Sequence, residues 1–260
     1  MPLEVPSTGE RARKFCIKNI LPLGFLLVLI IALVWPLPGI EVSKPEVEDY
    51  RVLQTLNVII IFIISGLTLK TDDIKKALSR EGIGGFGYGL FAILVITACV
   101  GFAAVKIPFD KDEFSYGLAV FCVVPTTLSS GVTLVNNAKG NDALALLLTV
   151  STNLLGVVTT PFFVQAVFTS GGAKIDAVDL LVGLIVTVLI PLVVGKVVRE
   201  TIHGVKGWVK RWKLSLSLTS SINLIMVVWQ TLSRAQETIT SVKFTEILSV
   251  IAAGAGLHIM

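Results

Sequence analysis

Long stretches without any charged residue divide this chain. Seven of them, 16 to 31 residues long, contain no Asp, Glu, Lys or Arg. A helix that crosses the hydrocarbon core of a bilayer needs about 20 mostly apolar residues and tolerates few charges. The stretches therefore predict seven membrane spans, at residues 19–40, 52–69, 82–105, 114–138, 143–173, 180–195 and 214–233.

An eighth apolar stretch runs to the last residue of the sequence. It covers only the 14 residues 247–260. At 1.5 Å per residue a helix of this length reaches about 21 Å, which is short of the roughly 30 Å hydrocarbon core. We therefore expect seven full spans and an eighth that the sequence leaves unfinished.

The composition supports an all-α, polytopic membrane protein. Hydrophobic residues make up 53% of the chain and charged residues only 15%, with a mean hydropathy of +0.83. A soluble domain carries roughly 25% charged residues. Cys16, Cys99 and Cys122 show no spacing typical of disulfides or metal sites. Because the sequence also contains no nucleophile with a base and no phosphate-binding loop, we expect no enzyme activity and no cofactor.

Lys and Arg residues predict the orientation of the spans. The tail at residues 1–18 carries four, and the loops after spans 2, 4 and 6 carry four, one and six. This side of the membrane therefore holds 15 of the 22 basic residues and the other side 7. Basic loops stay on the cytosolic side, so the N-terminus is expected on the cytosolic or stromal side. Anionic lipid headgroups explain the basic loops, and no nucleic-acid partner is needed.

The fourth span contains a proline at its middle. Pro125 is followed within six residues by Gly131, and four hydroxyl side chains lie between them: Thr126, Thr127, Ser129 and Ser130. Proline lacks an N–H group and clashes with the preceding helical turn, and the hydroxyl groups offer the backbone other hydrogen bonds. This pattern predicts a helix break near the bilayer midplane. The alternative is a simple proline kink that neighbouring Ser and Thr residues repair.

A broken helix at this depth offers binding groups for both cations and anions. Backbone carbonyls at the end of one half-helix provide cation ligands, and free N–H groups at the start of the next favour an anion. Secondary transporters bind their substrates and coupling ions at such breaks.

The fifth span supplies a partner surface for the break. Small and polar residues recur at helical spacings of 3, 1, 3 and 4, so they share one face that we expect to point inward: Thr149, Thr152, Asn153, Gly156 and Thr160. Packing of small residues with interhelical hydrogen bonds is the alternative explanation. Between the two spans, Gly and Asn residues at 136–142 suit left-handed turns, and Asp142 favours the start of the fifth helix. The candidate site residues are Pro125, Thr126, Thr127, Ser129, Ser130, Gly131, Thr149 and Asn153.

Three segments resemble a known transporter family. They are residues 121–162, which contain the PTTLSSG block, residues 62–70 (FIISGLTLK) and residues 185–200 (IVTVLIPLVVGKVVRE). These segments are similar to the bile acid:sodium symporter-like family, in its plant and algal branch of plastid sodium/metabolite cotransporter-like proteins. The PTTLSSG block is the most specific of them.

The resemblance implies a fold of ten helices in two inverted five-helix repeats. Residues 1–18 would be a basic tail, 19–173 the first repeat, and 174–260 an incomplete second repeat with spans 6, 7 and the start of 8. The resemblance also implies a panel domain of spans 1, 2, 6 and 7. A core domain would hold spans 3, 4, 5 and 8 to 10, with broken helices 4 and 9 crossing beside the sodium sites.

The same resemblance implies sodium ligands. Ser130 matches the serine of the family's Ser-Asn pair, but Gly131 stands where the family has Asn. On the fifth span Thr149 matches one hydroxyl position, whereas Ala145 stands at the other. The ligands of helix 9 would follow Met260. Ser130 and Thr149 are therefore the candidate ligands for a sodium ion, and sodium coupling stays open.

The expected function is secondary transport of a small organic anion or metabolite by alternating access, with membrane lipids as the surroundings. The plastid envelope is the location that the resemblance implies. The alternative is a truncated isoform, or a membrane scaffold or regulator that keeps the fold without transporting. A reading frame that continues past Met260 into another span broken by polar residues would favour the transporter, and a native stop there would favour the alternative.

Overall fold

The computed structural model describes residues 19–47, 50–69, 83–126 and 138–259, together with residues 9, 13, 15–17 and 135. Over these residues the chain is mainly helical, as the sequence predicts. One small exception is an antiparallel hairpin in which β1 (Glu46–Val47) pairs with β2 (Tyr50–Arg51). This hairpin connects the first two predicted spans.

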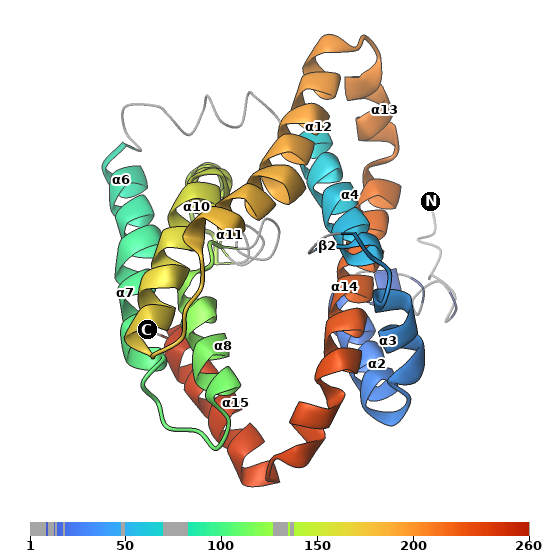
Figure 1. The fold of residues 1–260 in the computed structure, drawn as a ribbon. Coiled ribbons are helices and arrows are strands. Elements are labelled where there is room, and N and C mark those ends of the chain that lie inside the picture. Colours follow the sequence, from blue (N-terminus) through green and yellow to red (C-terminus); the bar gives the residue numbers. More distant parts are fainter. Residues whose placement is uncertain are drawn as a thin grey trace. The chain divides into compact units, whose positions relative to one another are not determined.

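Figure 1 shows the order of the helices along the chain. Two of them, η1 and η2, are single π-helical turns inside longer helices. In chain order the helices are α2 (Ile20–Val34), α3 (Leu37–Ser43), α4 (Val52–Thr68), α6 (Ile83–Phe91), η1 (Ala92–Ile96), α7 (Thr97–Ala104), α8 (Asp112–Val123), α10 (Asp142–Ser170), α11 (Ala177–Leu184), η2 (Ile185–Leu189), α12 (Ile190–Thr201), α13 (Val205–Arg211), α14 (Lys213–Ser241) and α15 (Phe244–Ile259).

The chain forms two compact units. The first comprises Met1–Leu69 with Ile190–Ser241, and the second comprises Lys70–Leu189 with Val242–Met260. Predicted spans 1, 2 and 7 thus belong to the first unit, and spans 3, 4, 5 and 8 to the second. This grouping parallels the panel and core sets that the resemblance implies, except that span 6 is divided between the units at Ile190. The repeat boundaries at 19–173 and 174–260 stay a prediction.

Several helices suit a bilayer by their length and composition. Within the described part of the chain, four are long and apolar enough to cross one: Gly84–Ala104, Leu144–Ser170, Ala177–Thr201 and Lys213–Ser241. The bent pair α2 and α3 would make a fifth, and Val52–Thr68 and Phe244–Leu257 are shorter apolar helices. The number of seven full spans therefore stays a prediction.

The first predicted span is not one continuous helix. The chain bends by 99° between α2 and α3, a bend that the charge-free stretch 19–40 did not indicate. Pro36 is the physical reason, because a residue before proline is driven out of the α region. Trp35 accordingly has non-helical angles, with φ −141° and ψ 76°.

In the first unit, α4 and α12 make backbone-to-backbone contact (Figure 1). A Cβ atom on Gly195 would overlap the carbonyl oxygen of Ile63, and one on Gly66 would lie 2.8 Å from the amide nitrogen of Lys196. Small residues allow helices in membranes to approach this closely, where van der Waals contact and not the hydrophobic effect drives association. This reciprocal pair of glycines sets the spacing of α4 and α12.

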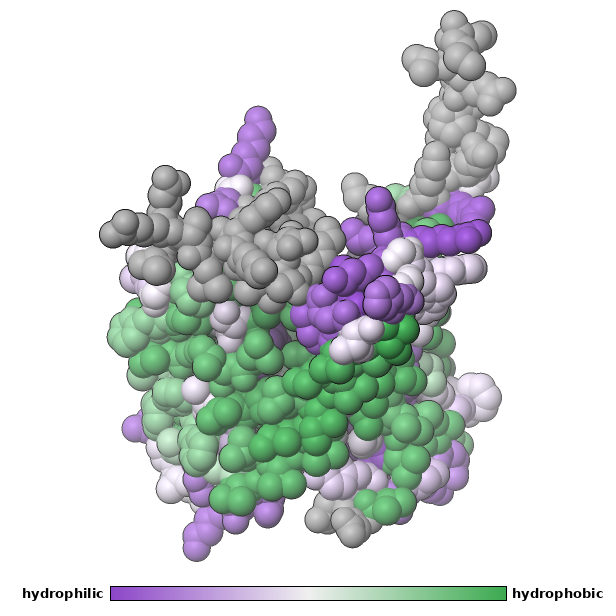
Figure 2. All heavy atoms as spheres, turned by 90° about the horizontal axis from the view of Figure 1, so that it is seen from above, coloured by the Kyte–Doolittle hydropathy of each residue, from purple (hydrophilic) through white to green (hydrophobic). Residues whose placement is uncertain are grey.

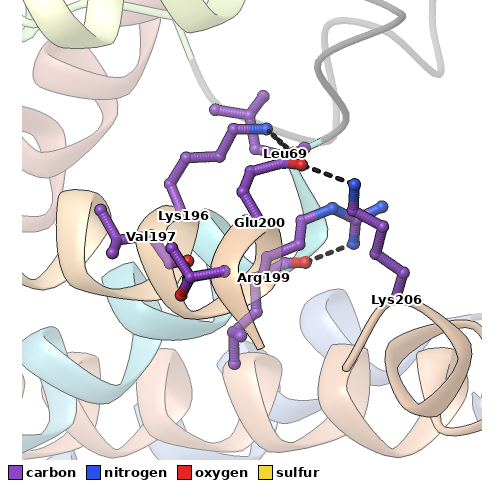
Figure 3. A network of polar contacts seen from close by, with 8 residues as sticks. Leu69, Lys196, Val197, Arg199, Glu200 and Lys206 are labelled. Carbon is purple, nitrogen blue, oxygen red and sulfur yellow. Dashed lines mark hydrogen bonds and ion pairs between the residues drawn. The ribbon is translucent and has the colours of Figure 1, made fainter. Parts of the chain in front are cut away.

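Cations from α12 cap the C-terminal end of α4 (Figure 3). Arg199 donates from Nη1 to the carbonyl oxygen of Leu67 at 2.6 Å. Lys196 donates from Nζ to the carbonyl oxygen of Leu69 at 2.7 Å, and pairs with Glu200 at 2.9 Å. The last carbonyls of a helix have no intrahelical donor and carry the negative end of its dipole, so positive side chains stabilise them.

In the second unit, α8 packs against α7 and α15. The buried cluster there consists mainly of small side chains from α7, α8 and α10: Ala98, Ala104, Val105, Leu118, Ala119, Cys122, Val123, Val164 and Val167. Small residues let these helices pack closely, which brings the end of α8 next to α10.

Apolar side chains also cover much of the outer surface. Figure 2 shows broad hydrophobic areas on the face that it draws. On α2, Leu27 is 58% and Val34 79% exposed, and on α12, Val197 is 50% exposed. Exposed apolar area on this scale is typical of a surface that meets lipid tails.

Replacement of Gly195 by Ala is expected to lower the free energy of unfolding by about 2 kcal/mol, because the added methyl meets backbone atoms of α4 that cannot rotate away. The matched control is Gly207→Ala on α13, where a Cβ has no neighbour within 4 Å. It should leave stability unchanged or raise it by a few tenths of a kcal/mol, up to about 1. Unfolding by SDS titration in mixed micelles measures both. Equal stability of the two variants would contradict the close contact.

Candidate functional site

The helix of the fourth predicted span ends where the sequence predicts a break. The last residue of α8 is Val123, and Val124 has the extended angles φ −70° and ψ 143°. Its N–H still donates to the carbonyl of Val120 at 3.0 Å, which is the last helical hydrogen bond. Val124 leaves the helix because it precedes Pro125, whose ring excludes the α conformation at that position.

The predicted polar face of α10 is buried. Thr149 is 3% and Thr152 0% exposed, and Gly156 is buried as well. The hydroxyl oxygen of Thr160 is also shielded from solvent, with no hydrogen-bond partner among the described residues. The expectation that this face points inward is confirmed.

Side chains of α10 bind the backbone at the break. Asn153 donates from Nδ2 to the carbonyl oxygen of Thr126 at 2.8 Å, and to the carbonyl oxygen of Thr149 at 2.7 Å. The hydroxyl oxygens of Thr126 and Thr152 lie 3.2 Å apart. A carbonyl released from a helix inside a membrane requires a donor of this kind, since no water is available to supply one. Asn153 therefore joins the two helices at the break.

A glycine makes room for the proline ring. A Cβ atom on Gly156 would lie 2.9 Å from Cγ of Pro125 and 3.4 Å from its Cβ and Cδ. These distances are too short for any larger side chain without movement. Gly156 thus lets the chain at Pro125 press directly against α10, one turn beyond Asn153.

The site presents neutral oxygens. The Thr149 hydroxyl donates to the carbonyl of Ala145 at 2.8 Å, which leaves its lone pairs free to accept. Thr152 donates in the same way to the carbonyl of Thr149 at 3.2 Å. Among the described residues no group of three His, Cys, Asp or Glu side chains could hold a metal ion. The arrangement suits a cation that accepts hydroxyl and carbonyl ligands.

Of the eight candidate residues, the structure brings together four: Pro125, Thr126, Thr149 and Asn153. The other four, Thr127, Ser129, Ser130 and Gly131, lie outside the described residues. Two residues of the arrangement, Thr152 and Gly156, were not among the candidates. Their spacing of three residues from Thr149 and from Asn153, respectively, was the signal that could have included them.

The connection before α10 differs from the expectation. Gly and Asn residues were expected to suit the left-handed conformation there. Asn136 and Asn137 lie outside the described residues, and among the described non-glycine residues Lys139 has this conformation, with φ 58°. Asn141 has a different role as the N-cap of α10, because its Oδ1 accepts from the N–H of Leu144 at 3.0 Å.

Comparison with known proteins decides the family. The model of the SBF-like CPA transporter family matches residues 19–260, which include every helix described above. The chain belongs to this family. The resemblance that the PTTLSSG block carries is thereby confirmed, and the apolar helices are those of an integral membrane protein.

Relatives with similar sequences carry transporter names. A probable sodium/metabolite cotransporter, BASS4, chloroplastic, from Oryza sativa subsp. indica is 37% identical over 253 residues, which are 97% of this chain and 58% of the relative. The protein of the same name from Arabidopsis thaliana is 36% identical over 96% of the chain and 56% of the relative. Sodium/bile acid cotransporter 7-A from Xenopus laevis is 29% identical over 80% of the chain and 59% of the relative. The chain thus spans somewhat less than three fifths of the relatives it matches.

Replacement of Asn153 by Ala is expected to lower the free energy of unfolding by about 2 kcal/mol, since the half-buried Thr126 carbonyl would lose this donor. Asn223→Ala on α14 is the matched control, because that side chain donates only to the carbonyl of Thr219 in its own helix. The control should change stability by less than about 0.5 kcal/mol. SDS titration measures both variants, and equal losses would show that Asn153 does not join the helices.

Proposed function

We propose that this protein is a secondary transporter of a small organic anion or metabolite, and that it works by alternating access. The observation that carries the proposal is the end of α8 before Pro125 in the fourth span. There the side chain of Asn153 of α10 donates to the carbonyl oxygen of Thr126. The family and the transporter names of the relatives support it. The eight candidate residues of the break and of α10 would line the binding site.

We also propose that sodium is the coupling ion. The C-terminal end of α8 directs the negative end of its dipole toward the break, which favours a cation. Ser130 and Thr149 are the proposed ligands from side chains. The stretches 82–105, 114–138 and 143–173 contain no Asp, Glu, Lys, Arg or His that could relay a proton. Neutral oxygens are the groups that these spans offer, and they suit sodium.

The proposed architecture is that of two inverted repeats, with residues 19–173 as the first and 174–260 in the second. Grouping of spans 1, 2 and 7 apart from spans 3, 4, 5 and 8 supports this proposal. The proposed orientation has the N-terminus on the cytosolic or stromal side, because 15 of 22 basic residues would then face it. The plastid envelope is the proposed location, since the plant relatives are named chloroplastic.

Transport by the full gene product in proteoliposomes tests the function. Bile acids and small carboxylates are offered with and without an inward sodium gradient, and saturable, sodium-driven uptake of at least one is expected.

The double variant Pro125→Ala/Gly131→Ala should abolish saturable uptake without loss of expression, because a continuous helix would remove the break. Gly207→Ala is the control. Unchanged uptake by the double variant contradicts the proposal. No uptake by the inserted wild type favours a non-transporting scaffold or regulator.

Replacement of Thr149 by Val tests the sodium site. This change preserves the shape of the side chain and removes its oxygen, so half-saturating sodium should rise about tenfold, which equals about 1.4 kcal/mol. Thr201→Val is the matched control, because that hydroxyl also donates only to a carbonyl in its own helix, at 2.7 Å. Sodium dependence that is the same in both variants would exclude Thr149 as a ligand.

A further inference from the structure

A second polar cluster lies in the first unit, on one side of α14. Within the described residues, several of its buried nitrogen and oxygen atoms have no hydrogen-bond partner: Trp229 Nε1, Gln230 Nε2 and Oε1, Ser233 Oγ, and Arg234 Nε and Nη1. These four residues fall within six positions and are related by spacings of one, three, four and five, so they form one continuous patch on the helix. Gln230 is 0% and Ser233 1% exposed.

The patch lies where α14 meets α3 and α4. On one side, a Cβ atom on Gly39 of α3 would overlap the side chain of Ser233 and lie 3.4 Å from Cε2 of Trp229. Figure 1 shows α14 next to α2 and α3, and α14 packs against α4 as well. On that second side, Gln54 Nε2 of α4 donates to Thr231 Oγ1 at 3.4 Å. The patch is therefore enclosed by helices of its own unit.

The helix α4, which packs against α14, carries a further unpartnered donor. Asn57 lies one turn after Gln54, is 7% exposed, and its Nδ2 is buried without a partner among the described residues. A buried polar group without a partner costs about 1 to 3 kcal/mol, and a charged one costs more. Several of them together are costly unless something binds between them.

Donors dominate the cluster. Five of the seven unpartnered atoms are nitrogens that carry N–H groups, one is the Ser233 hydroxyl, and only Gln230 Oε1 is an acceptor alone. Two of the five belong to the guanidinium group of Arg234, which forms no ion pair with a described carboxylate. Ordered water could satisfy the neutral groups, but it does not compensate the charge of a guanidinium group with two buried nitrogens.

We propose that this cluster binds an anionic oxygen group, either a carboxylate or a phosphate. Arg234 would bind it through its fork of N–H groups, which matches the geometry of both anions. Gln230, Trp229 and Asn57 would add neutral donors. A free solute and a lipid headgroup carry the same chemistry, so either can be the source. The proposal is independent of transport at the Pro125 break, because it involves only residues of α4 and α14.

Trp229 provides a reporter inside the cluster. The chain has four tryptophans, and the variant Trp35→Phe/Trp208→Phe/Trp212→Phe leaves Trp229 alone. The full chain in detergent is titrated with inorganic phosphate and with acetate at constant ionic strength. The Trp229 emission is expected to change saturably. In nanodiscs, the Trp229 emission should differ between phosphatidylglycerol and phosphatidylcholine if a lipid headgroup is the source.

Arg234→Gln in this background should abolish the response. Lys213→Gln is the matched control, because Lys213 is an exposed cation at the other end of the same helix, and it should leave the response intact. If Arg234→Gln does not fold, Arg234→Lys and Gln230→Leu replace it, each with an expected affinity loss of at least fivefold.

Saturation by phosphate or acetate supports a free anion, and a response only to phosphatidylglycerol supports a headgroup. No response to any of them, or an equal response in the Arg234 variants, overturns the proposal.

Discussion

A backbone carbonyl that leaves a helix inside a membrane must find a new donor, and the second unit depends on how this is done. At the Pro125 break the donor is the side chain of Asn153, which reaches the Thr126 carbonyl at 2.8 Å. Lipid offers no hydrogen bonds, so the break persists only because another helix supplies one. The arrangement of α8 and α10 follows from that need. Gly156 and the small side chains of α7 and α8 allow the helices to come close enough.

The first unit satisfies its backbone by a different means. Cations at the end of α12 cap the carbonyls at the end of α4, and a pair of glycines lets the two helices touch along their backbones. Polar groups are also buried on α14, but those remain without partners in the described chain. One unit therefore uses the amide of Asn153 to join helices, while the other holds the set of donors for which we propose an anion.

The sequence predicted the parts that depend on local chemistry. The break at Pro125 follows from the missing N–H and the crowding of the preceding residue, and the inward face of α10 follows from helical spacing alone. The sequence pattern did not indicate the bend at Pro36, because the charge-free stretch of the first span continues through that proline. It also did not indicate that Lys139 adopts the left-handed conformation before α10.

By itself, the sequence determined that this is a helical membrane protein of a transporter family and that a helix ends just before Pro125. These properties depend on hydropathy, on charge and on proline, which act over neighbouring residues. Only the tertiary structure decided that Asn153 binds Thr126, that Gly66 and Gly195 face each other, and that the donors of α14 are enclosed beside α3 and α4. Partners such as Leu67 and Arg199 are 132 positions apart, and no local periodicity relates residues across such a distance.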